Sequence, residues 1–403
     1  MFLYICLVSS LGDFPKSRII SIIHPLNLSL VLKSEEKNYL NHPLFLFSKT
    51  LSQNSLKIQK SSFSGFVNHA IKGFPKNLYV ERTKFRNSLT CLVYLGADNS
   101  FSGKDFQSRF LAINGEAKFS SCSFQALVSK NGNDEEKNGG AIYANGYNLE
   151  FIDCLFTGNT AVSGGSCYLN NSFAHFEKSN FSLNHATSEG GAMFSINSIV
   201  EMKECIFVKN KAELSSGAIR MINTTYNSDS TIFHENRALS TSAVIEADFS
   251  RIKMESNQFS ANKCEFQPGG TVIVLSSSTC QLLACYFSIS AKKKEIKKPI
   301  SSDSNSSVSA KLSCFDIPSD QVSKYIGGVF KESPTNQYNG DCPYLHVEAQ
   351  QPFDVLEFSE SLPISISNKS LIIIIFSLIS TIALVTIVMY KNSRPKSQYT
   401  KTI

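Results

Sequence analysis

The stretch Phe181-Ser-Leu-Asn184 returns 26 residues later as Phe207-Val-Lys-Asn210, and this repeat decides the fold. The shared pattern is Phe, two variable residues and Asn, and successive copies are separated by 25, 26, 26 and 26 residues. The five copies are bounded by Phe156 and Asn159, Phe181 and Asn184, Phe207 and Asn210, Phe233 and Asn236, and Phe259 and Asn262.

A second column keeps the same period and is rich in glycine. Glycine at a repeated position permits a tight turn or a close approach between neighbouring backbones. The column consists of Gly139 and Gly140, Gly164 and Gly165, Gly190 and Gly191, Gly217 within Ser216-Gly217-Ala218-Ile219, a degenerate Thr241-Ser242-Ala243-Val244, and Gly270.

A fixed period of this length indicates a solenoid, because one unit cannot bury its apolar face alone. Within each unit the apolar residues alternate, as in Cys205 and Phe207, which is the period of a strand. The sequence therefore predicts an all-β fold, a parallel β-helix with coils about 4.8 Å apart. The Phe residues should stack as an internal ladder. The Asn residues should turn the chain in left-handed backbone conformation and bond to the amide of the next coil.

The paired glycine and Phe-x-x-Asn motifs resemble those of the polymorphic outer membrane protein (Pmp) repeat family, and the resemblance covers roughly residues 124–290. It implies a right-handed parallel β-helix, a pectin-lyase-like solenoid, displayed on a cell surface with adhesion as its usual role. Bacterial members end in a membrane β-barrel. This chain instead ends in one apolar segment, so the resemblance points to the protozoan (trichomonad-like) single-pass type.

Composition shifts divide the 403 residues. The expected parts are a short signal peptide at 1–12, for which a buried first strand is the alternative, an N-terminal cap at 13–57, and the β-helix at 58–290, with its best repeats at 122–290. Residues 291–369 are expected to form a solvated linker and a membrane-proximal region. Lysines in the linker could also bind acidic glycans or an anionic membrane. The insertion at 131–138 should be an exposed loop.

Residues 370–390 carry no charge and are long enough to cross a bilayer. Basic residues follow in 391–403, so the positive-inside rule predicts a cytoplasmic tail and an outside N-terminus. The predicted location is the plasma membrane, as a type I cell-surface protein.

Eleven cysteines in such a context permit disulfides, with Cys122–Cys154, Cys280–Cys285 and Cys314–Cys342 as candidate pairs. Alternatively, cysteines two residues before the Phe column are buried small apolar residues. Sequons suggest a glycoprotein, with acceptors at Asn27, Asn170, Asn180, Asn223 and Asn305. Asn180 precedes the inward Phe181 and should therefore point outward and be accessible.

The sequence contains no recognisable catalytic arrangement, no metal-ligand spacing and no cofactor-binding loop. Asp153, Asp229 and Asp248 stand singly, and Glu150 and Glu201 are interpreted as isolated surface acids. The net charge of +6 is mild and does not indicate nucleic-acid binding.

The leading hypothesis is a non-enzymatic adhesin whose β-helix contacts a host-cell or extracellular-matrix protein or glycan. The alternative is a polysaccharide-binding or polysaccharide-cleaving β-helix, either lyase-like or hydrolase-like. A structural coat component is a third possibility.

Overall fold

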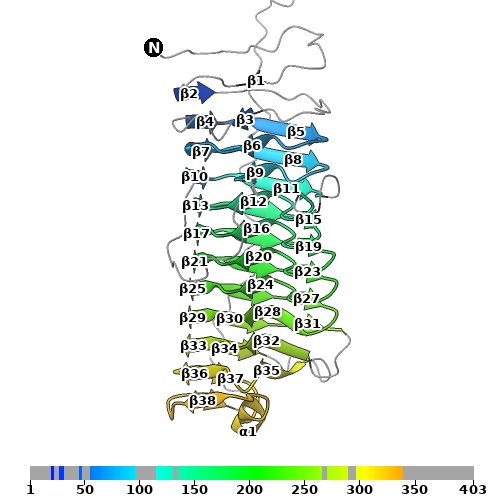
Figure 1. Cartoon of the computed structure of the whole chain (residues 1–403). Coiled ribbons are helices and arrows are strands. Elements are labelled where there is room, and N and C mark those ends of the chain that lie inside the picture. The colour runs from blue at the N-terminus through cyan, green and yellow to red at the C-terminus, as the bar shows by residue number, and fades with distance from the viewer. Residues whose placement is uncertain are drawn as a thin grey trace, which may run out of the picture. The chain divides into compact units, whose positions relative to one another are not determined.

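The computed structural model describes residues 20–21, 27–30, 45–47, 55–96, 115–129, 134, 136–265, 270–288 and 296–338. These residues lie within one compact unit, Met1–His346. The unit is a parallel β-solenoid in which each coil contributes a strand to each of three long sheets (Figure 1). The prediction of an all-β parallel β-helix is confirmed.

Sheet A has eleven strands among the described residues and carries the glycine column at its entrance. Its strands are β1 (Ile20–Ser21), β3 (Phe45–Phe47), β6 (Ile71–Gly73), β9 (Val93–Leu95), β12 (Ile142–Asn145), β16 (Cys167–Asn170), β20 (Met193–Ile196), β24 (Ile219–Ile222), β28 (Ser242–Asp248), β32 (Gly270–Ser276) and β35 (Ile296–Ser302).

Sheet B has twelve described strands and follows sheet A in every coil. Its strands are β2 (Asn27–Leu30), β4 (Ser55–Gln59), β7 (Asn77–Glu81), β10 (Gly115–Ser120), β13 (Tyr147–Ile152), β17 (Phe173–Glu177), β21 (Ile199–Lys203), β25 (Thr225–Asp229), β29 (Arg251–Glu255), β33 (Thr279–Leu283), β36 (Ser307–Lys311) and β38 (Val329–Glu332).

Sheet C has eleven described strands and carries the Phe column, and sheet D is a short five-stranded sheet after the Asn column. Sheet C contains β5 (Ser62–Phe66), β8 (Lys84–Ser88), β11 (Ser123–Leu127), β14 (Leu155–Thr157), β18 (Asn180–Ser182), β22 (Ile206–Val208), β26 (Ile232–His234), β30 (Gln258–Ser260), β34 (Tyr286–Ser288), β37 (Cys314–Phe315) and β39 (Gln337–Tyr338). Sheet D contains β15 (Thr160–Ala161), β19 (His185–Ala186), β23 (Lys211–Ala212), β27 (Arg237–Ala238) and β31 (Lys263–Cys264). One short helix, α1 (Ser319–Ser323), follows β37.

The Phe column forms the predicted internal ladder. Phe181 and Phe207 stack with ring centroids 4.5 Å apart, and both side chains are fully buried. The ladder is longer than predicted, since Phe63 and Phe85 extend it at one end and Phe315 and Tyr338 at the other. A second aromatic ladder on sheet B packs edge-on against it through Phe119, Phe151 and Phe176. The aromatic core is therefore two ladders wide in these coils.

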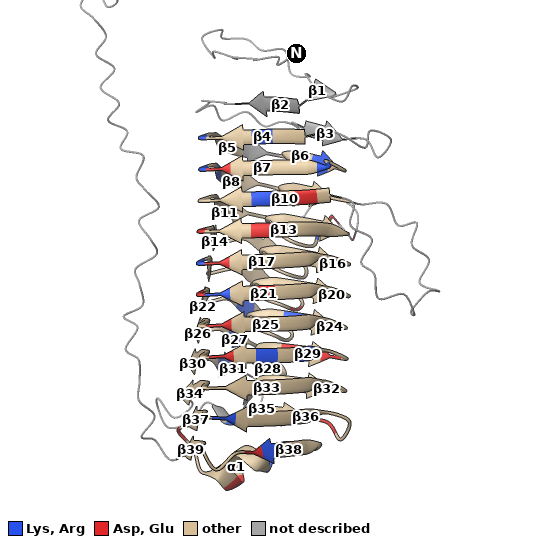
Figure 2. Ribbon diagram, turned by 90° about the vertical axis from the view of Figure 1, so that its left-hand side faces the viewer, with Lys and Arg blue, Asp and Glu red and all other residues tan. Residues whose placement is uncertain are grey.

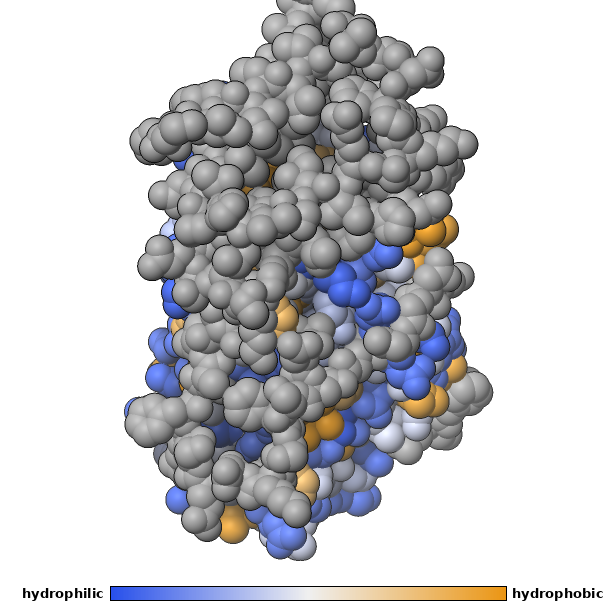
Figure 3. Space-filling view, turned by 45° about the horizontal axis from the view of Figure 1, so that its top comes forward, coloured by the Kyte–Doolittle hydropathy of each residue, from blue (hydrophilic) through white to orange (hydrophobic). Residues whose placement is uncertain are grey.

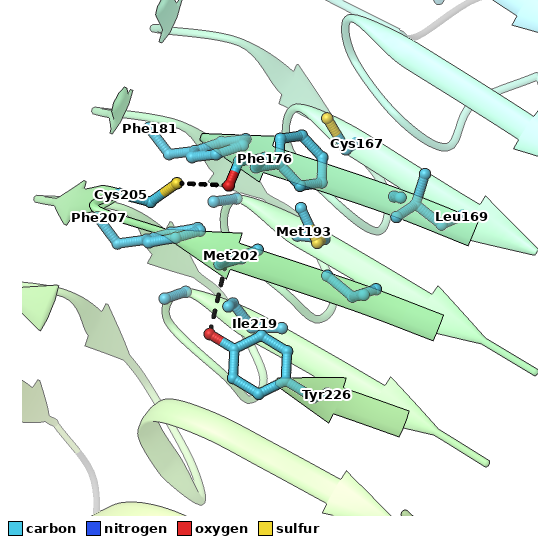
Figure 4. Packing of buried hydrophobic residues seen from close by; sticks show 14 of the residues in the cluster. Cys167, Leu169, Phe176, Phe181, Met193, Met202, Cys205, Phe207, Ile219 and Tyr226 are labelled. Carbon is cyan, nitrogen blue, oxygen red and sulfur yellow. Dashed lines mark hydrogen bonds between the residues drawn. The ribbon is translucent and has the colours of Figure 1, made fainter. Parts of the chain in front are cut away.

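Around Phe181 and Phe207 the core is filled by sulfur-containing and aliphatic side chains (Figure 4). Tyr226 is fully buried beneath Met202 and donates its hydroxyl hydrogen to the Met202 sulfur at 3.4 Å. Burial raises the pKa of Tyr226, so its hydroxyl stays protonated.

The Asn column lies inside the solenoid and forms the predicted amide ladder. The side-chain Nδ2 of Asn210 donates to Oδ1 of Asn236 and to the Phe181 carbonyl, both at 2.9 Å. The predicted left-handed conformation is wrong, because it belongs to the preceding residue, as in Leu183 (φ 56°) and Lys209 (φ 54°). The Asn side chain instead satisfies the backbone groups that the turn leaves unpaired.

The two glycines of each pair have different tasks. The first adopts positive φ, as at Gly190 (67°). The second packs against backbone, since a Cβ on Gly191 would lie 2.1 Å from the Gly217 carbonyl oxygen. Both expected roles, turn and close contact, are thus present in one pair.

The degenerate glycine motif is one residue out of the predicted alignment. Ile245, rather than Val244, pairs with Ile219, and the register shifts between Ser242 and Ile245. Strand β28 therefore carries a bulge at this coil. Gly270 pairs with Ile296 at the start of β32.

The predicted domain limits need correction at both ends. Strands β1 to β4 overlap the expected cap and pair with the sheets of the solenoid, so the described coils begin before residue 58. Strands β35 and β36 lie where the linker was expected, and Phe315 stacks on Phe287 at 4.9 Å. These coils lack the Phe-x-x-Asn motif, but they keep the alternating strand pattern that stacking requires.

The predicted signal peptide, membrane span and tail lie outside the described residues. Within the described ranges, no helix has both the length and the apolar character needed to cross a bilayer.

The candidate cysteine pairs Cys122–Cys154 and Cys280–Cys285 are not formed, because all four thiols are free and buried, as the alternative interpretation expected for the column before the Phe residues. Cys314 is disulfide-bonded, and Cys342 lies outside the described residues. The residue two positions before each Phe of the ladder lies at a corner of the coil and donates a hydrogen bond there. Cys205 Sγ donates to the Lys203 carbonyl at 3.4 Å, and Ser179 Oγ donates to the Glu177 carbonyl at 3.1 Å. Cysteine and serine are thus equivalent donors at this corner.

Candidate functional site

The outer face of sheet A carries a column that changes in character along the solenoid. It begins with stacked aromatic rings, Tyr94 on Tyr143 at 4.4 Å, Tyr143 on Tyr168 at 5.3 Å and Tyr168 on Phe194 at 5.2 Å. The next coil places Arg220 beside Phe194, and the coil after that places Glu246 beside Arg220. The charged side chains of this column are therefore Lys72, which precedes Tyr94, and then Arg220 and Glu246, which follow the rings.

Arg220 gathers three carboxylates around one guanidinium. Its Nε lies 3.3 Å from Glu189, its Nη2 donates to Asp248, and the same nitrogen lies 3.9 Å from Glu246. The Arg220 side chain is only 7% exposed, whereas the three acids keep 16% to 30% of their surface. The guanidinium is therefore the buried centre of an acidic cluster whose outer edge reaches solvent.

Burial opposes the positive charge on Arg220. The hydrogen bond to Asp248 and the charges of the three carboxylates outweigh that effect and raise the pKa of the guanidinium. Arg220 also donates from Nη1 to the Met221 carbonyl at 2.9 Å. These contacts fix the guanidinium, so the carboxylates are held around a rigid centre.

This cluster coincides with the irregular coil. Thr241 stands near the glycine column and donates its hydroxyl hydrogen to Glu246, while Ser242 Oγ bonds to the Ile245 carbonyl at 2.6 Å across the bulge. Bulges are frequent next to functional sites because they redirect a side chain. In a repeat this regular, a bulge that coincides with a buried ionic cluster marks the candidate site.

Val274 follows Glu246 in this column, and a hydroxyl, that of Ser276, follows Asp248 at the edge of the sheet. Ser276 Oγ bonds to Asp303 at 3.2 Å, and hydrogen bonds from Ser306 and from the Ser277 backbone lower the pKa of Asp303. The Ser302 hydroxyl is buried, with no hydrogen-bond partner within the described part of the chain. The edge of the sheet beside the cluster thus adds Ser276 and Asp303 as hydrogen-bonding groups, whereas the Ser302 hydroxyl is not accessible.

The arrangement favours binding over bond cleavage. A pair of carboxylates that cleaves a glycosidic bond must flank that bond. Here Arg220 bonds to Glu189 through one nitrogen and to Asp248 through another, so the guanidinium already lies between these two acids. Carboxylate, guanidinium and hydroxyl groups together suit a polyhydroxylated ligand.

The sequence does not predict this cluster. Asp248 stands as a single acid in the sequence, because Glu189 lies 59 residues before it in the chain. The available signal was the Arg at a position that is aromatic in four earlier coils, followed by Glu one coil later. That signal requires the strand register, which the misaligned degenerate motif obscured.

Glu150 and Glu201, which the sequence also singled out, lie elsewhere, on the outer face of sheet B. Glu150 pairs with Lys118 at 3.2 Å and Glu201 with His175 at 3.5 Å. Figure 2 shows opposite charges distributed over the strands of this sheet. They are exposed surface pairs, as expected for isolated acids.

A buried histidine near the N-terminal coils does not form a catalytic pair with cysteine. The His69 Nδ1 lies 2.5 Å from the Cys91 carbonyl oxygen, and its Nε2 lies 3.5 Å from Glu136. Burial lowers the pKa of His69 and raises that of the Cys91 thiol, so both side chains favour their neutral forms. Glu136 also binds Lys72 at 2.6 Å, which corrects the expectation that the whole 131–138 insertion is solvated.

The sequon asparagines differ in exposure. Asn180 is buried, with 6% of its surface exposed, between Leu155 and Ile206 on adjacent coils, which corrects the prediction that it is accessible. Asn223 and Asn305 are exposed, and Asn170 is half-buried. The side chain of Asn27 lies outside the described residues. The described part of the chain holds no group of three or more His, Cys, Asp or Glu residues that could bind a metal.

The coloured residues on the face that Figure 3 shows are mainly hydrophilic, with separate small hydrophobic groups. The molecule is defined as a parallel β-helix with a charged site on one sheet face.

No family model matches the chain, and no curated protein matches it. Among solved structures, it is similar to the catalytic unit of a thermostable GH87 alpha-1,3-glucanase from Streptomyces thermodiastaticus strain HF3-3, with 10% identity and a TM-score of 0.27. The match covers 73% of this chain and 60% of that one, so the chain spans less than two thirds of the glucanase unit.

Proposed function

We propose that this protein is a polysaccharide-binding β-helix and that the Arg220 cluster, comprising Arg220, Glu189, Glu246 and Asp248, is its binding site. The observation that carries the proposal is the coincidence of a buried, triply paired arginine with a bulge in the repeat. Sugar hydroxyls both donate and accept, so they can bond to the exposed carboxylate edges and to the nearby serine hydroxyls. Because three carboxylates surround one cation, the cluster favours neutral sugars over acidic ones.

The test is binding of the full-length chain, in mild detergent, to an array of neutral and acidic glycans. The informative variant is Asp248→Asn, which keeps the shape of the side chain. We expect it to weaken binding of a neutral glycan by about tenfold, since a hydrogen bond to a charged group contributes about 1.5 kcal/mol or more. Glu201→Gln on sheet B is the matched control and should leave binding unchanged. Failure of the intact chain to bind any glycan would exclude the proposal.

Hydrolysis is the second candidate, because the cluster places three carboxylates on one face. It would require a bound substrate to displace Arg220 from between the acids. Release of new reducing ends from a neutral polysaccharide, lost in Glu246→Gln, would support hydrolysis. Binding without such release would assign the site to recognition alone.

We further propose that the β-helix is displayed on the cell surface as a type I membrane protein, of the kind that the Pmp-like motifs suggest. The apolar segment 370–390 and the basic residues after it support this topology. A tag inserted next to the exposed Asp134 should be labelled on intact cells, and a tag after Ile403 should not. Label on neither tag would exclude surface display.

A further inference from the structure

A column of basic side chains follows sheet D, on the side of the solenoid next to sheet A (Figure 1). His185, Lys211, Arg237 and Lys263 occupy the same position of four successive coils. Their neighbours in the two-residue strands are buried and small, so the column residues point outward. The Lys211 side chain is 42% exposed and that of Arg237 is 56% exposed.

Like charges stacked in register are unfavourable for the fold. Strand neighbours in adjacent coils lie about 4.8 Å apart, and like charges directly opposite each other destabilise a sheet. On sheet B, by contrast, Lys118 lies beside Glu150, so opposite charges face each other in adjacent coils. The sheet D column does not alternate, so its stacked cations oppose stability instead of contributing to it.

Two acids next to the column offset part of its charge. Glu213 accepts from Lys211 at 2.9 Å and contacts His185 at 2.7 Å, while Glu265 lies 4.0 Å from Arg237. Hydrogen bonds from Lys211 and His185 lower the pKa of Glu213, so it stays ionised. Each acid comes two residues after a residue of the column. When His185 is neutral, the column therefore carries three positive charges, and two carboxylates lie beside it.

We propose that this cation ladder, His185, Lys211, Arg237 and Lys263, binds a linear sulfated polysaccharide along the solenoid axis. One pyranose unit of an extended chain advances by a distance close to the coil spacing, so successive sulfates can meet successive cations. Arginine and lysine are the side chains that bind such anions, through bidentate and point-charge contacts respectively. The ladder is separate from the Arg220 cluster, whose excess of carboxylates repels sulfate.

A single-stranded nucleic acid is a poorer match to the ladder. Proteins that bind single strands combine cations with aromatic side chains on which bases stack. The outward column of sheet D, which begins with Thr160, contains no such platform apart from the His185 ring. A sulfated sugar needs only the charges and their spacing.

Glu213 allows a test in which a substitution is expected to strengthen binding, whereas substitutions of the ladder residues are expected to weaken it. A bound sulfate near Lys211 would compete with the Glu213 carboxylate for the same ammonium group. Removing that carboxylate should therefore strengthen binding, whereas a ladder with a purely structural role would show no gain.

The experiment measures heparin binding by the full-length chain in mild detergent, with neutral dextran and a single-stranded DNA of similar length as comparisons. We expect Lys211→Gln and Arg237→Gln each to weaken heparin binding about fivefold, and the double variant about twentyfold, because a close charge pair in water contributes about 1 kcal/mol. Glu213→Gln should strengthen binding about fivefold on the same ground. Added salt should weaken all these interactions.

The control is Lys253→Gln, an exposed lysine on the outer face of sheet B. Heparin binding that falls equally in Lys253→Gln and Lys211→Gln would show unspecific charge attraction and overturn the proposal. So would unchanged binding in the ladder variants, or DNA binding as tight as heparin binding. Asp248→Asn should leave heparin binding intact, so failure of the neutral-glycan site and failure of the ladder can be distinguished.

Discussion

Asn184 Nδ2 donates a 2.9 Å hydrogen bond to Oδ1 of Asn210 on the next coil, and the same Asn210 oxygen accepts from the Asn184 backbone N–H at 3.1 Å. Both residues are fully buried. One side chain therefore satisfies a neighbouring amide and a neighbouring backbone group at a corner that has no strand partner. This relationship explains why the repeat requires Asn and not merely a small polar residue.

Replacing Asn210 with Ala should destabilise the solenoid by about 3 kcal/mol, because buried donors and acceptors on adjacent coils lose their partner. The free energy of unfolding in urea measures this change. The control is Asn227→Ala on the outer face of β25, where the expected change is about 0.5 kcal/mol or less. Equal effects at the two positions would contradict the role of the Asn ladder.

Gly191→Ala should prevent correct stacking, since its Cβ would lie 2.1 Å from the Gly217 carbonyl oxygen and 2.7 Å from the Lys211 backbone. Gly158→Ala is the matched substitution: its φ is 64°, but the nearest atom would lie 4.0 Å away. The expected loss is about 3 kcal/mol or more at Gly191 and about 1 kcal/mol at Gly158. Thermal unfolding of the two variants shows whether the close backbone contact at Gly191 or the left-handed conformation at Gly158 contributes more to stability.

Phe315→Ala tests whether the coils after residue 290 belong to the hydrophobic core. Phe315 is fully buried between Phe287 and Tyr338, so we expect a loss of about 3 to 5 kcal/mol. Leu312→Ala, at a side chain that is 52% exposed, should cost far less. A small effect at Phe315 would restore the interpretation of this segment as a linker.

The Cys205 thiol should make stability depend on pH. Burial raises its pKa to about 12, whereas an unfolded thiol titrates near about 8.5. The folded value is the higher one, so the stabilising effect is complete below about 8.5 and is lost as pH rises towards about 12. Urea unfolding at rising pH should show this loss of stability. Cys205→Ser should reduce the loss, because serine does not titrate in this range and can make the same corner hydrogen bond that Ser179 makes on its own coil. A pH slope identical in both proteins would contradict the assignment.

In a secretory host, we expect glycan occupancy to differ among the sequons according to the exposure of each Asn side chain in the folded protein. We expect glycan on the exposed Asn223 and Asn305, and reduced yield of folded protein when Asn180 is modified, because that side chain is buried. Mass spectrometry of the purified chain measures site occupancy. Full occupancy of Asn180 in folded protein would show that this part of sheet C opens.

The periodic residues alone determined the fold class, because a parallel solenoid places every repeat in the same environment. Spacing between Phe181 and Phe207 predicted the ladder, and the glycine pairs predicted both a turn and a close contact. The sequence did not reveal that Cys205 and Ser179 are equivalent corner donors, since that role depends on carbonyl groups in another strand.

Only the tertiary structure decided the limits of the solenoid and the position of the candidate site. Coils that lack the motif, such as those of β35 and β36, stack by backbone hydrogen bonds that are independent of side-chain identity. The bulge in β28 shifts the register by one residue, and the Arg220 cluster assembles residues from three coils at that point. A short repeat fixes what lies within one coil, whereas contacts across coils depend on the register that packing selects.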